Sequence, residues 1–250
     1  MVDEPLLRRE LHYGDRVVRC FADRPKCIDE MFRQVVIRHP DRVALVLDGQ
    51  RISYRDVDAK VEFIAGNLIA CGFEKGERIA LLLGNCLEFV YSVLAAARVG
   101  IVVVPMNIRQ RKPEIEFVLN QCEAACLIYQ ASLAENVPEP NLVPHLRSSF
   151  VVGGTGESSF DVLLTPAQTS RVDVVEEDVF CLLYTSGTTG KPKGAMLTHL
   201  GTIHSVMHYE YGMGLSRDGE ISILAVPASH VTGLVANILT MIRVFGVLPS

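Results

Sequence analysis

The residues with the clearest chemical potential form one glycine-rich stretch at 184–194, with the sequence YTSGTTGKPKG. The stretch contains three glycines, four Ser or Thr hydroxyls and two lysines. Glycine lets the backbone bring its amide N–H groups close to a ligand, and the hydroxyls add further donors. Lysine adds a compact positive charge. This composition predicts a cradle for the phosphates of a nucleotide.

The spacing separates this stretch from the Walker A loop, which has the pattern GxxxxGK[ST]. Here two residues, rather than four, lie between Gly187 and Gly190, and Lys191 is followed by Pro192. The stretch is therefore not a Walker A loop. A Gly/Thr-rich hairpin turn with solubilising lysines is the simple alternative, and the length and order of the pattern disfavour it.

Residues 186–194 resemble the AMP-binding signature of the adenylate-forming superfamily. That group includes acyl-CoA and aryl-CoA synthetases, luciferases and the adenylation domains of peptide synthetases. The pair Thr198-His199 also fits the pattern. The resemblance implies a loop that binds the β- and γ-phosphates of ATP while a carboxylate attacks the α-phosphate. The products would be an acyl-adenylate and pyrophosphate, and CoA would then accept the acyl group as a thioester.

This resemblance assigns roles to individual residues of the loop. The residues that would hold ATP are Thr185, Ser186, Gly187, Thr188, Thr189, Gly190, Lys191 and Lys193. Lys193 would also be catalytic, because its charge would stabilise the leaving pyrophosphate. A solvated surface charge is the alternative for Lys191, since exposed charges usually contribute little. Magnesium is expected only together with ATP, bound mainly by phosphate and carboxylate oxygens.

A second motif, PASHVTG at 227–233, resembles the PxxHxxG segment of the same family. The resemblance places this segment between the ATP site and the acyl pocket, with His230 as a catalytic residue near the carboxylate or α-phosphate. The family often has an aromatic residue before this histidine, and Ser229 stands there instead, so the shape of the acyl pocket stays open. Taken alone, a histidine near a helix start is more often a structural hydrogen-bonding residue.

Two further features are assigned no chemistry. Residues 98–107, RVGIVVVPMN, resemble the GxxxxPxN segment of the family, and we assign them a packing role. His204 and His208 lie four residues apart on a predicted helix, a spacing at which two imidazoles can share a metal. The sequence offers neither an HExxH arrangement nor another nearby ligand, so we predict no metal site there.

The order of apolar runs and amphipathic patterns predicts the fold class. Strands are expected at 43–47, 79–83, 101–104, 125–129 and 179–184. Helices are expected to begin near Ile28, Ser53, Asn85, Pro113 and Thr198. Strands that are apolar throughout and alternate with helices indicate parallel β-α units with helices on both faces. The predicted class is therefore α/β.

The remaining segments carry weaker signals. Residues 1–25 show no clear period and are expected to be an N-terminal extension, draped on the domain or partly disordered. Residues 130–178 are rich in Pro and Gly and are expected to cross between two halves of the sheet, with 153–156 as a surface loop. Near the end we expect a strand at 221–226, a helix at 232–244 and the start of another strand at 246–248.

Composition excludes several classes of protein. With 250 residues and 49% apolar residues, the chain can bury a large core. Its net charge of −5 disfavours a nucleic-acid-binding surface, and no uninterrupted apolar stretch reaches the roughly 18 residues of a membrane span. Seven scattered cysteines without a spacing framework favour reduced thiols in a cytoplasmic protein.

The resemblance runs from about Cys27 to Leu248, whereas members of the family are considerably longer. We therefore expect residues 26–250 to be part of an AMP-binding N-terminal domain, without the small C-terminal domain and inactive alone. The parent enzyme would be an acyl-CoA synthetase for a fatty or aryl acid. Two alternatives stay open: a naturally short nucleotide-binding or interaction module without catalysis, and a peptide-synthetase adenylation domain.

Overall fold

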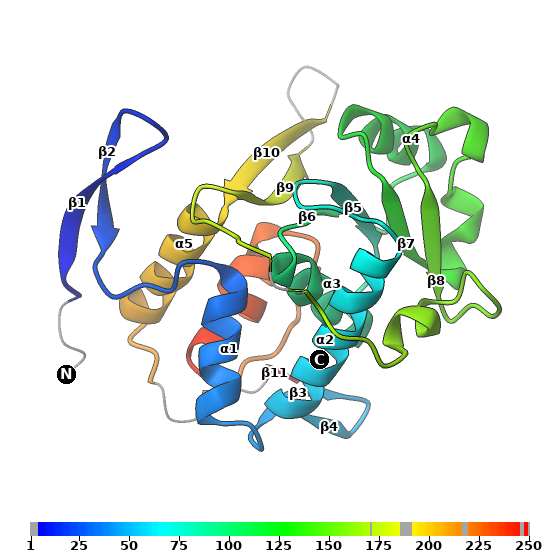
Figure 1. Cartoon of the computed structure of the whole chain (residues 1–250). Helices are drawn as coiled ribbons and strands as arrows, with labels where there is room; N and C mark the ends of the chain where they lie inside the picture. Colours follow the sequence, from blue (N-terminus) through cyan, green and yellow to red (C-terminus); the bar gives the residue numbers. More distant parts are fainter. Residues whose placement is uncertain (1–4, 171, 186–191, 217–219, 246–247, 250) are drawn as a thin grey trace.

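The computed structural model describes residues 5–170, 172–185, 192–216, 220–245 and 248–249 (Figure 1). One six-stranded sheet dominates it. Its strands are β5 (Arg78–Leu82), β6 (Val102–Pro105), β7 (Cys126–Gln130), β8 (Ser148–Val152), β9 (Val179–Thr185) and β10 (Lys193–Thr198). The spatial order is β10-β9-β6-β5-β7-β8, with only β10 antiparallel to its neighbour in this sheet. The predicted α/β class with parallel strands is confirmed.

Helices cover both faces of this sheet, as the amphipathic patterns predicted. They are α1 (Ile28–Arg38), α2 (Tyr54–Ala70), α3 (Leu87–Arg98), α4 (Lys112–Gln121) and α5 (His199–Gly212). Successive side chains of a strand point to opposite faces. Along β5, Ile79 and Leu81 therefore enter the larger core with α1, α2, α3 and α5, whereas Ala80 and Leu82 enter the smaller core with α4.

A second sheet has the order β11-β3-β4. Its strands are β3 (Val43–Leu47), β4 (Gln50–Ser53) and β11 (Leu248–Pro249). The strand predicted at 43–47 is confirmed, and so is the capping box, in which Ser53 and Asp56 exchange hydrogen bonds at the start of α2. β11 pairs parallel to β3, which agrees with the strand start predicted at 246–248, although 246–247 lie outside the described residues.

The N-terminal extension has more order than its sequence suggested. β1 (Leu7–His12) and β2 (Arg16–Phe21) form an antiparallel hairpin that stands at one edge of the molecule beside α5 (Figure 1). Tyr13 (φ 54°) and Gly14 (φ 84°) turn the chain with left-handed backbone angles. Of the two expectations for residues 1–25, the structure favours an extension that lies on the domain over a partly disordered one for residues 7–21.

Arg98 joins three helices from a buried position. Its guanidinium donates to Asp29 Oδ1 at 2.7 Å on α1, and to Asp58 Oδ1 at 2.6 Å and Glu62 Oε2 at 2.9 Å on α2. Because Arg98 is the last residue of α3, these bonds fix how the three helices lie against one another.

Arg98→Met should destabilise the chain by about 3 kcal/mol, because it leaves the largely buried carboxylate of Asp29 without its cation. Urea unfolding followed by circular dichroism measures this change. Arg55→Met is the matched control, since Arg55 and its partner Asp41 are both exposed, and it should change stability by less than about 0.5 kcal/mol. Equal losses in the two variants would contradict the bridging role.

His199 makes the stability depend on pH. It is 1% exposed, and its Nδ1 accepts the backbone N–H of Ile28 at 3.2 Å. Burial lowers the pKa of this imidazole from 6.5 to about 4. The unfolded state therefore binds the proton more tightly than the folded state.

Stability should consequently fall as pH drops from about 6.5 to about 4, by up to about 3 kcal/mol from this residue alone. Carboxylates titrate in the same range, so wild type and His199→Asn must be compared across this window. The variant should lose less stability on acidification. Parallel pH profiles would remove His199 as the cause.

Candidate functional site

A pocket of about 440 Å³ lies at the carboxyl ends of β6 and β9. Its walls come from three stretches of chain. The lining residues are Pro105, Met106, Asn107, Gln110, Glu114, Val118, Leu183, Tyr184, Thr185, Pro192, Ser229, His230, Val231 and Thr232. The structure thus brings together the motifs at 98–107, 184–194 and 227–233. In α/β sheets, ligands bind just beyond the carboxyl ends of the strands, which is where this pocket lies.

The glycine-rich stretch includes the end of β9 and the start of β10. Thr185 ends β9 and lines the pocket, and Lys193 begins β10 directly opposite it. Lys193 is exposed and is not among the pocket-lining residues. The remaining predicted ATP ligands, which are Ser186, Gly187, Thr188, Thr189, Gly190 and Lys191, lie outside the described residues.

Gly194 has a packing reason for being glycine. It lies opposite Tyr184 in the β9–β10 pair, and the aromatic ring of Tyr184 covers it. A Cβ at position 194 would lie 3.1 Å from Cζ of that ring, closer than side chains normally pack. Burial raises the pKa of Tyr184 to about 12, so the phenol stays neutral beside the pocket at pH 7.

Asn85 holds the segment that leads to His230. Its side-chain amide donates to the carbonyl oxygens of Leu224 (3.1 Å) and Val226 (3.0 Å), and its Oδ1 accepts the N–H of Ala228 (2.8 Å). The helix expected near Asn85 is confirmed as α3, but Cys86 rather than Asn85 is its N-cap. The strand predicted at 221–226 is wrong. Residues 222–226 form no strand: the side-chain amides of Asn85 (to Leu224 and Val226) and Asn237 (to Ile223) bond carbonyl oxygens that a neighbouring strand would otherwise have paired.

The PxxHxxG spacing also has a geometric basis. The N–H of His230 donates to the carbonyl of Pro227 at 3.1 Å, which makes a tight turn. A Cβ on Gly233 would lie 2.2 Å from the oxygen of Pro227, so only glycine lets the next helix begin against this turn. That helix comprises a π-helical part, η4 (Thr232–Leu239), and α6 (Thr240–Arg243). The helix predicted at 232–244 is confirmed, and π-helical turns are frequent at functional sites.

Asn107 is a pocket residue that sequence reasoning assigned to packing. Its Oδ1 accepts the N–H of Arg109 at 2.9 Å, which turns the amide NH₂ toward Nε2 of His230 at 3.5 Å. The Oε1 atom of Gln110, from the same turn, is buried without a hydrogen-bond partner among the described residues. The turn after β6 thus presents two amides to the pocket. A polar residue directly after an apolar strand was the available signal.

Comparison with known proteins agrees with this geometry. The sequence pattern of the AMP-binding enzyme family matches residues 32–246, which is most of the chain. The chain belongs to the AMP-binding enzyme family. It is similar to 2-succinylbenzoate–CoA ligase of Bacillus cereus (strain Q1), with 29% identity over 78% of this chain and 37% of the relative. It is also similar to the long-chain-fatty-acid–CoA ligase of Salmonella typhimurium, with 28% identity over 90% of this chain and 46% of the relative.

Among solved structures, a putative long-chain-fatty-acid CoA ligase from Rhodopseudomonas palustris has the same fold. It superposes with a TM-score of 0.82 and 25% identity, over 89% of this chain and 56% of that chain. The chain spans less than half the length of the two curated relatives. In the part of the chain that the structure describes, no helix is long and apolar enough to cross a membrane.

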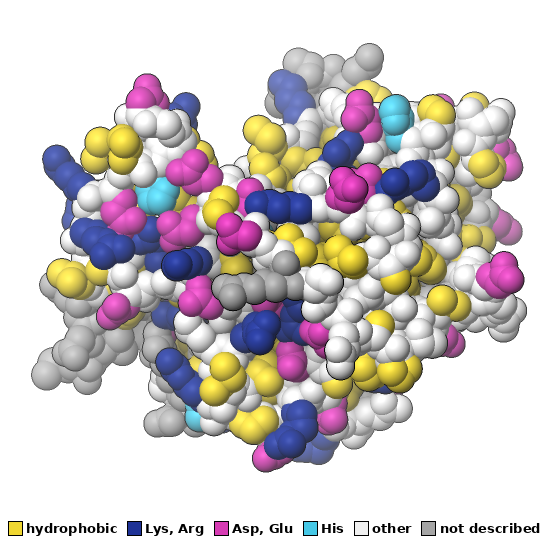
Figure 2. All heavy atoms as spheres, viewed as in Figure 1, with side chains coloured by type: hydrophobic (Ala, Val, Ile, Leu, Met, Phe, Trp, Pro, Cys, Tyr) yellow, Lys and Arg dark blue, Asp and Glu magenta, His cyan; other side chains and the backbone are white. Residues whose placement is uncertain are grey.

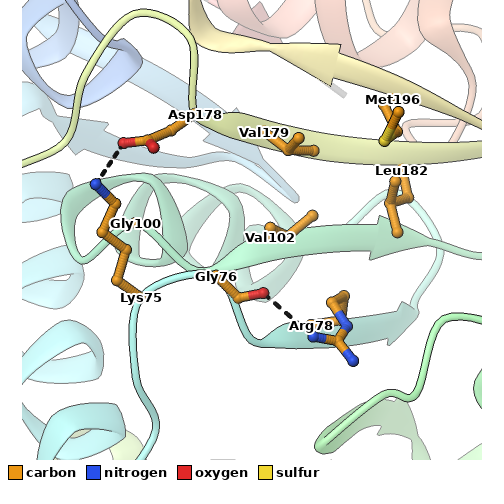
Figure 3. Close-up of a pocket in the computed structure, with 9 residues that line it drawn as sticks. All are labelled: Lys75, Gly76, Arg78, Gly100, Val102, Asp178, Val179, Leu182 and Met196. Atoms are coloured by element: carbon orange, nitrogen blue, oxygen red, sulfur yellow. Dashed lines mark hydrogen bonds and ion pairs between the residues drawn. The ribbon is translucent and has the colours of Figure 1, made fainter.

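A smaller pocket of about 280 Å³ lies on the sheet face near the opposite end of β9 (Figure 3). Lys75 and Asp178 form an ion pair of 2.6 Å at one side of it. Its wall along the strands consists of the apolar side chains of Val102, Leu182 and Met196. The charge of Lys75 is thus already compensated, and Arg78, the other cation in the lining, is paired with Glu123 at 3.0 Å. Both cations of this pocket are therefore already engaged within the protein.

His204 and His208 belong to an aromatic cluster on α5. The ring of Phe21 lies 5.0 Å from that of His204 and 4.9 Å from that of His208, measured between centroids. Burial lowers the pKa of His204, which favours its neutral form. The two imidazoles therefore anchor the end of β2 to α5 by packing.

Gly233→Ala should displace the His230 turn, because the added methyl group would meet backbone atoms that cannot rotate away. We expect a destabilisation of about 1–3 kcal/mol, as for overpacked sites. Thermal unfolding measures the change. Gly212→Ala is the control, since a Cβ there meets nothing within 4 Å. A Gly233→Ala variant as stable as this control would refute the tight turn.

Proposed function

We propose that this chain provides the ATP-phosphate and carboxylate side of an enzyme that converts a carboxylic acid to its CoA thioester. A carboxylate oxygen attacks the α-phosphorus of ATP, and the bond from that phosphorus to the bridging oxygen of pyrophosphate breaks. The thiol of CoA then attacks the acyl carbon and releases AMP. The observation that carries the proposal is the single pocket shared by Thr185, Asn107 and His230.

Within this proposal, the β9–β10 turn holds the phosphates. Thr185 and the Ser, Thr and Gly residues of 186–190 would donate hydrogen bonds, and Lys193 would place its charge on the departing pyrophosphate. Lys193 is supported by its position opposite Thr185 at the base of the turn. Lys191 is proposed as a second phosphate ligand on the family signature alone.

His230 is proposed to face the reacting carboxylate or α-phosphate. Donation from Asn107 to Nε2 requires that nitrogen to be unprotonated, which places the ring proton of the neutral imidazole on Nδ1. The Nδ1–H group would then be the donor toward a substrate oxygen. Asn107 is thereby a positioning residue for His230.

Magnesium is proposed to arrive with ATP. Glu114 is the carboxylate among the described pocket-lining residues, and its Oε2 already accepts the N–H of Arg111 at 2.8 Å. One carboxylate that already accepts a hydrogen bond is not enough to coordinate magnesium. The phosphates of ATP supply the oxygen ligands that magnesium prefers.

A fatty or aryl acid is the proposed substrate class. The ligase relatives are named for 2-succinylbenzoate and long-chain fatty acids, and Met106, Leu183 and Val231 give the pocket apolar surface.

We also propose residues 26–250 as the partial AMP-binding domain and 1–25 as its extension. The seven free thiols favour a cytoplasmic location.

Lys193→Ala should weaken binding of ATP by about tenfold or more, because it removes a charged contact to phosphate. Isothermal calorimetry with ATP and magnesium measures the affinity. Lys60→Ala, which removes a lysine from the distant helix α2, is the matched control and should bind as wild type does. Unchanged affinity of Lys193→Ala would remove Lys193 as a ligand of the phosphates in bound ATP.

The wild-type protein used for calorimetry can also be tested for turnover of ATP. We expect ATP binding without sustained carboxylate-dependent pyrophosphate release from these 250 residues. Robust release would contradict the proposal that the chain supplies only one side of the site.

The reading frame after Ser250 distinguishes a larger ligase from a short binding module. A frame that continues supports the ligase, and a stop codon supports the module.

A further inference from the structure

The N-terminal hairpin has two chemically different faces. Its register pairs Leu7 with Phe21, Arg9 with Arg19, and Leu11 with Val17 on one face, here called the outer face. The other face, the inner face, carries the pairs Arg8–Cys20, Glu10–Val18 and His12–Arg16. Successive side chains of a strand point to opposite faces, so a contact that covers one face of the hairpin leaves the other face accessible.

The inner face attaches the hairpin to the body of the protein. Arg24 Nη2 lies 2.6 Å from Glu10 Oε2, and Arg24 Nε lies 2.7 Å from Glu176 Oε1. His12 Nδ1 lies 3.2 Å from Glu177 Oε1. Arg24 thus links Glu10 of the hairpin to Glu176, just before β9, and the contact of His12 with Glu177 adds a second attachment.

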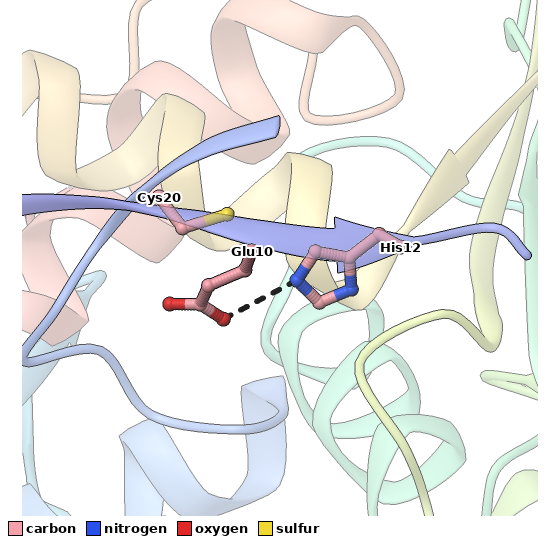
Figure 4. Close-up of side chains that lie close together, drawn as sticks. All are labelled: Glu10, His12 and Cys20. Atoms are coloured by element: carbon pink, nitrogen blue, oxygen red, sulfur yellow. Dashed lines mark hydrogen bonds and ion pairs between the residues drawn. The ribbon is translucent and has the colours of Figure 1, made fainter. Parts of the chain in front are cut away.

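Glu10, His12 and Cys20 of this inner face lie close together (Figure 4). Their potential ligand atoms fall within 4.8 Å of one another, as in a metal site. The carboxylate of Glu10, however, already accepts hydrogen bonds from Arg24 and Arg8, which hold its pKa far below the usual range. A metal ion would have to displace these guanidiniums, so we interpret the group as part of the attachment.

At the Phe21 end, the outer face is covered, because Phe21 is 2% exposed and packs against α5. Toward the turn, the outer face carries side chains without partners among the described residues. Leu11 is 65% exposed and Val17, directly opposite, is 66% exposed. Arg9 and Arg19 are both exposed and stand opposite each other, and no carboxylate among the described residues forms an ion pair with either. Like charges facing each other across two strands are destabilising. An external anion would relieve this repulsion.

Exposed apolar residues are concentrated here as well. The large hydrophobic side chains exposed in residues 6–17 are Leu6, Leu7, Leu11, Tyr13 and Val17. The hairpin strands and their turn carry four arginines against Glu10 and Asp15, in a chain whose net charge is −5. In Figure 2, basic, acidic and hydrophobic side chains all lie over the hairpin.

We propose that the outer face of this hairpin docks onto an anionic phospholipid surface. Arg9 and Arg19 bind lipid phosphates through their forked guanidiniums, and Leu11 and Val17 enter the boundary between headgroups and acyl chains. A second copy packed face to face would set arginines against arginines. A nucleic acid backbone would offer no apolar surface to Leu11 and Val17. A lipid interface offers anionic phosphates to the arginines and an apolar layer to Leu11 and Val17.

Vesicle co-sedimentation tests this without any substrate. The full chain should sediment with phosphatidylcholine vesicles that contain phosphatidylglycerol, and should bind vesicles of phosphatidylcholine alone about tenfold or more weakly. Arg9→Glu/Arg19→Glu and Leu11→Ser/Val17→Ser should each reduce binding to the anionic vesicles by about tenfold or more. Raised salt should weaken binding by the wild type.

Matched controls come from exposed residues elsewhere. Arg51→Glu on β4 and Ile37→Ser, which alters a side chain that is 78% exposed on α1, should bind like the wild type. Circular dichroism must show that every variant keeps its fold. Equal binding to both vesicle types, or equal losses in control and hairpin variants, would overturn the proposal. So would a dimer in light scattering that the hairpin substitutions abolish without any vesicle binding.

Discussion

The candidate site depends on the hydrogen bonds that the side-chain amide of Asn85 makes. Asn85 follows β5 and makes three hydrogen bonds to the backbone between Leu224 and Ala228. Ala228 comes 143 residues later in the chain and has no strand partner there. Because buried backbone groups must be paired, this amide determines where the later segment passes. His230 can face Asn107 only because that path is fixed.

The sheet and the motif positions could be predicted because their causes are local. The strands around Ile79, Val103 and Leu127 are buried on both faces, so their apolar runs are continuous and stand out in the sequence. The glycines of two motifs have equally local causes. Gly194 accommodates the ring of Tyr184, and Gly233 accommodates the carbonyl of Pro227. The spacing of the glycines in these two motifs therefore reflects close contacts in the folded chain.

The errors occurred where the partner lies far away in sequence. Asn85 with Glu88 three residues on looks like a helix start, and nothing local indicates that the amide bonds to Leu224. The run at 221–226 is apolar enough for a strand, yet its partner is that same side chain. Tertiary contacts overrode local preference in both places. The hairpin was missed for a different reason: its partner strand is close in sequence, but Arg9 and Arg19 interrupt the alternation of polar and apolar residues that indicates a strand.

The hairpin and the pocket are attached to the same structural unit. The N–H of Tyr13 donates to Glu177, just before β9, and its hydroxyl bonds to Thr198, the last residue of β10, at 2.8 Å. The hairpin thus holds the base of the β9–β10 pair, and the candidate phosphate turn lies at its far end. β9 has seven residues, so the two ends are about 20 Å apart. A lipid surface bound to the outer face would therefore be connected to the pocket through the hairpin and the β9–β10 pair.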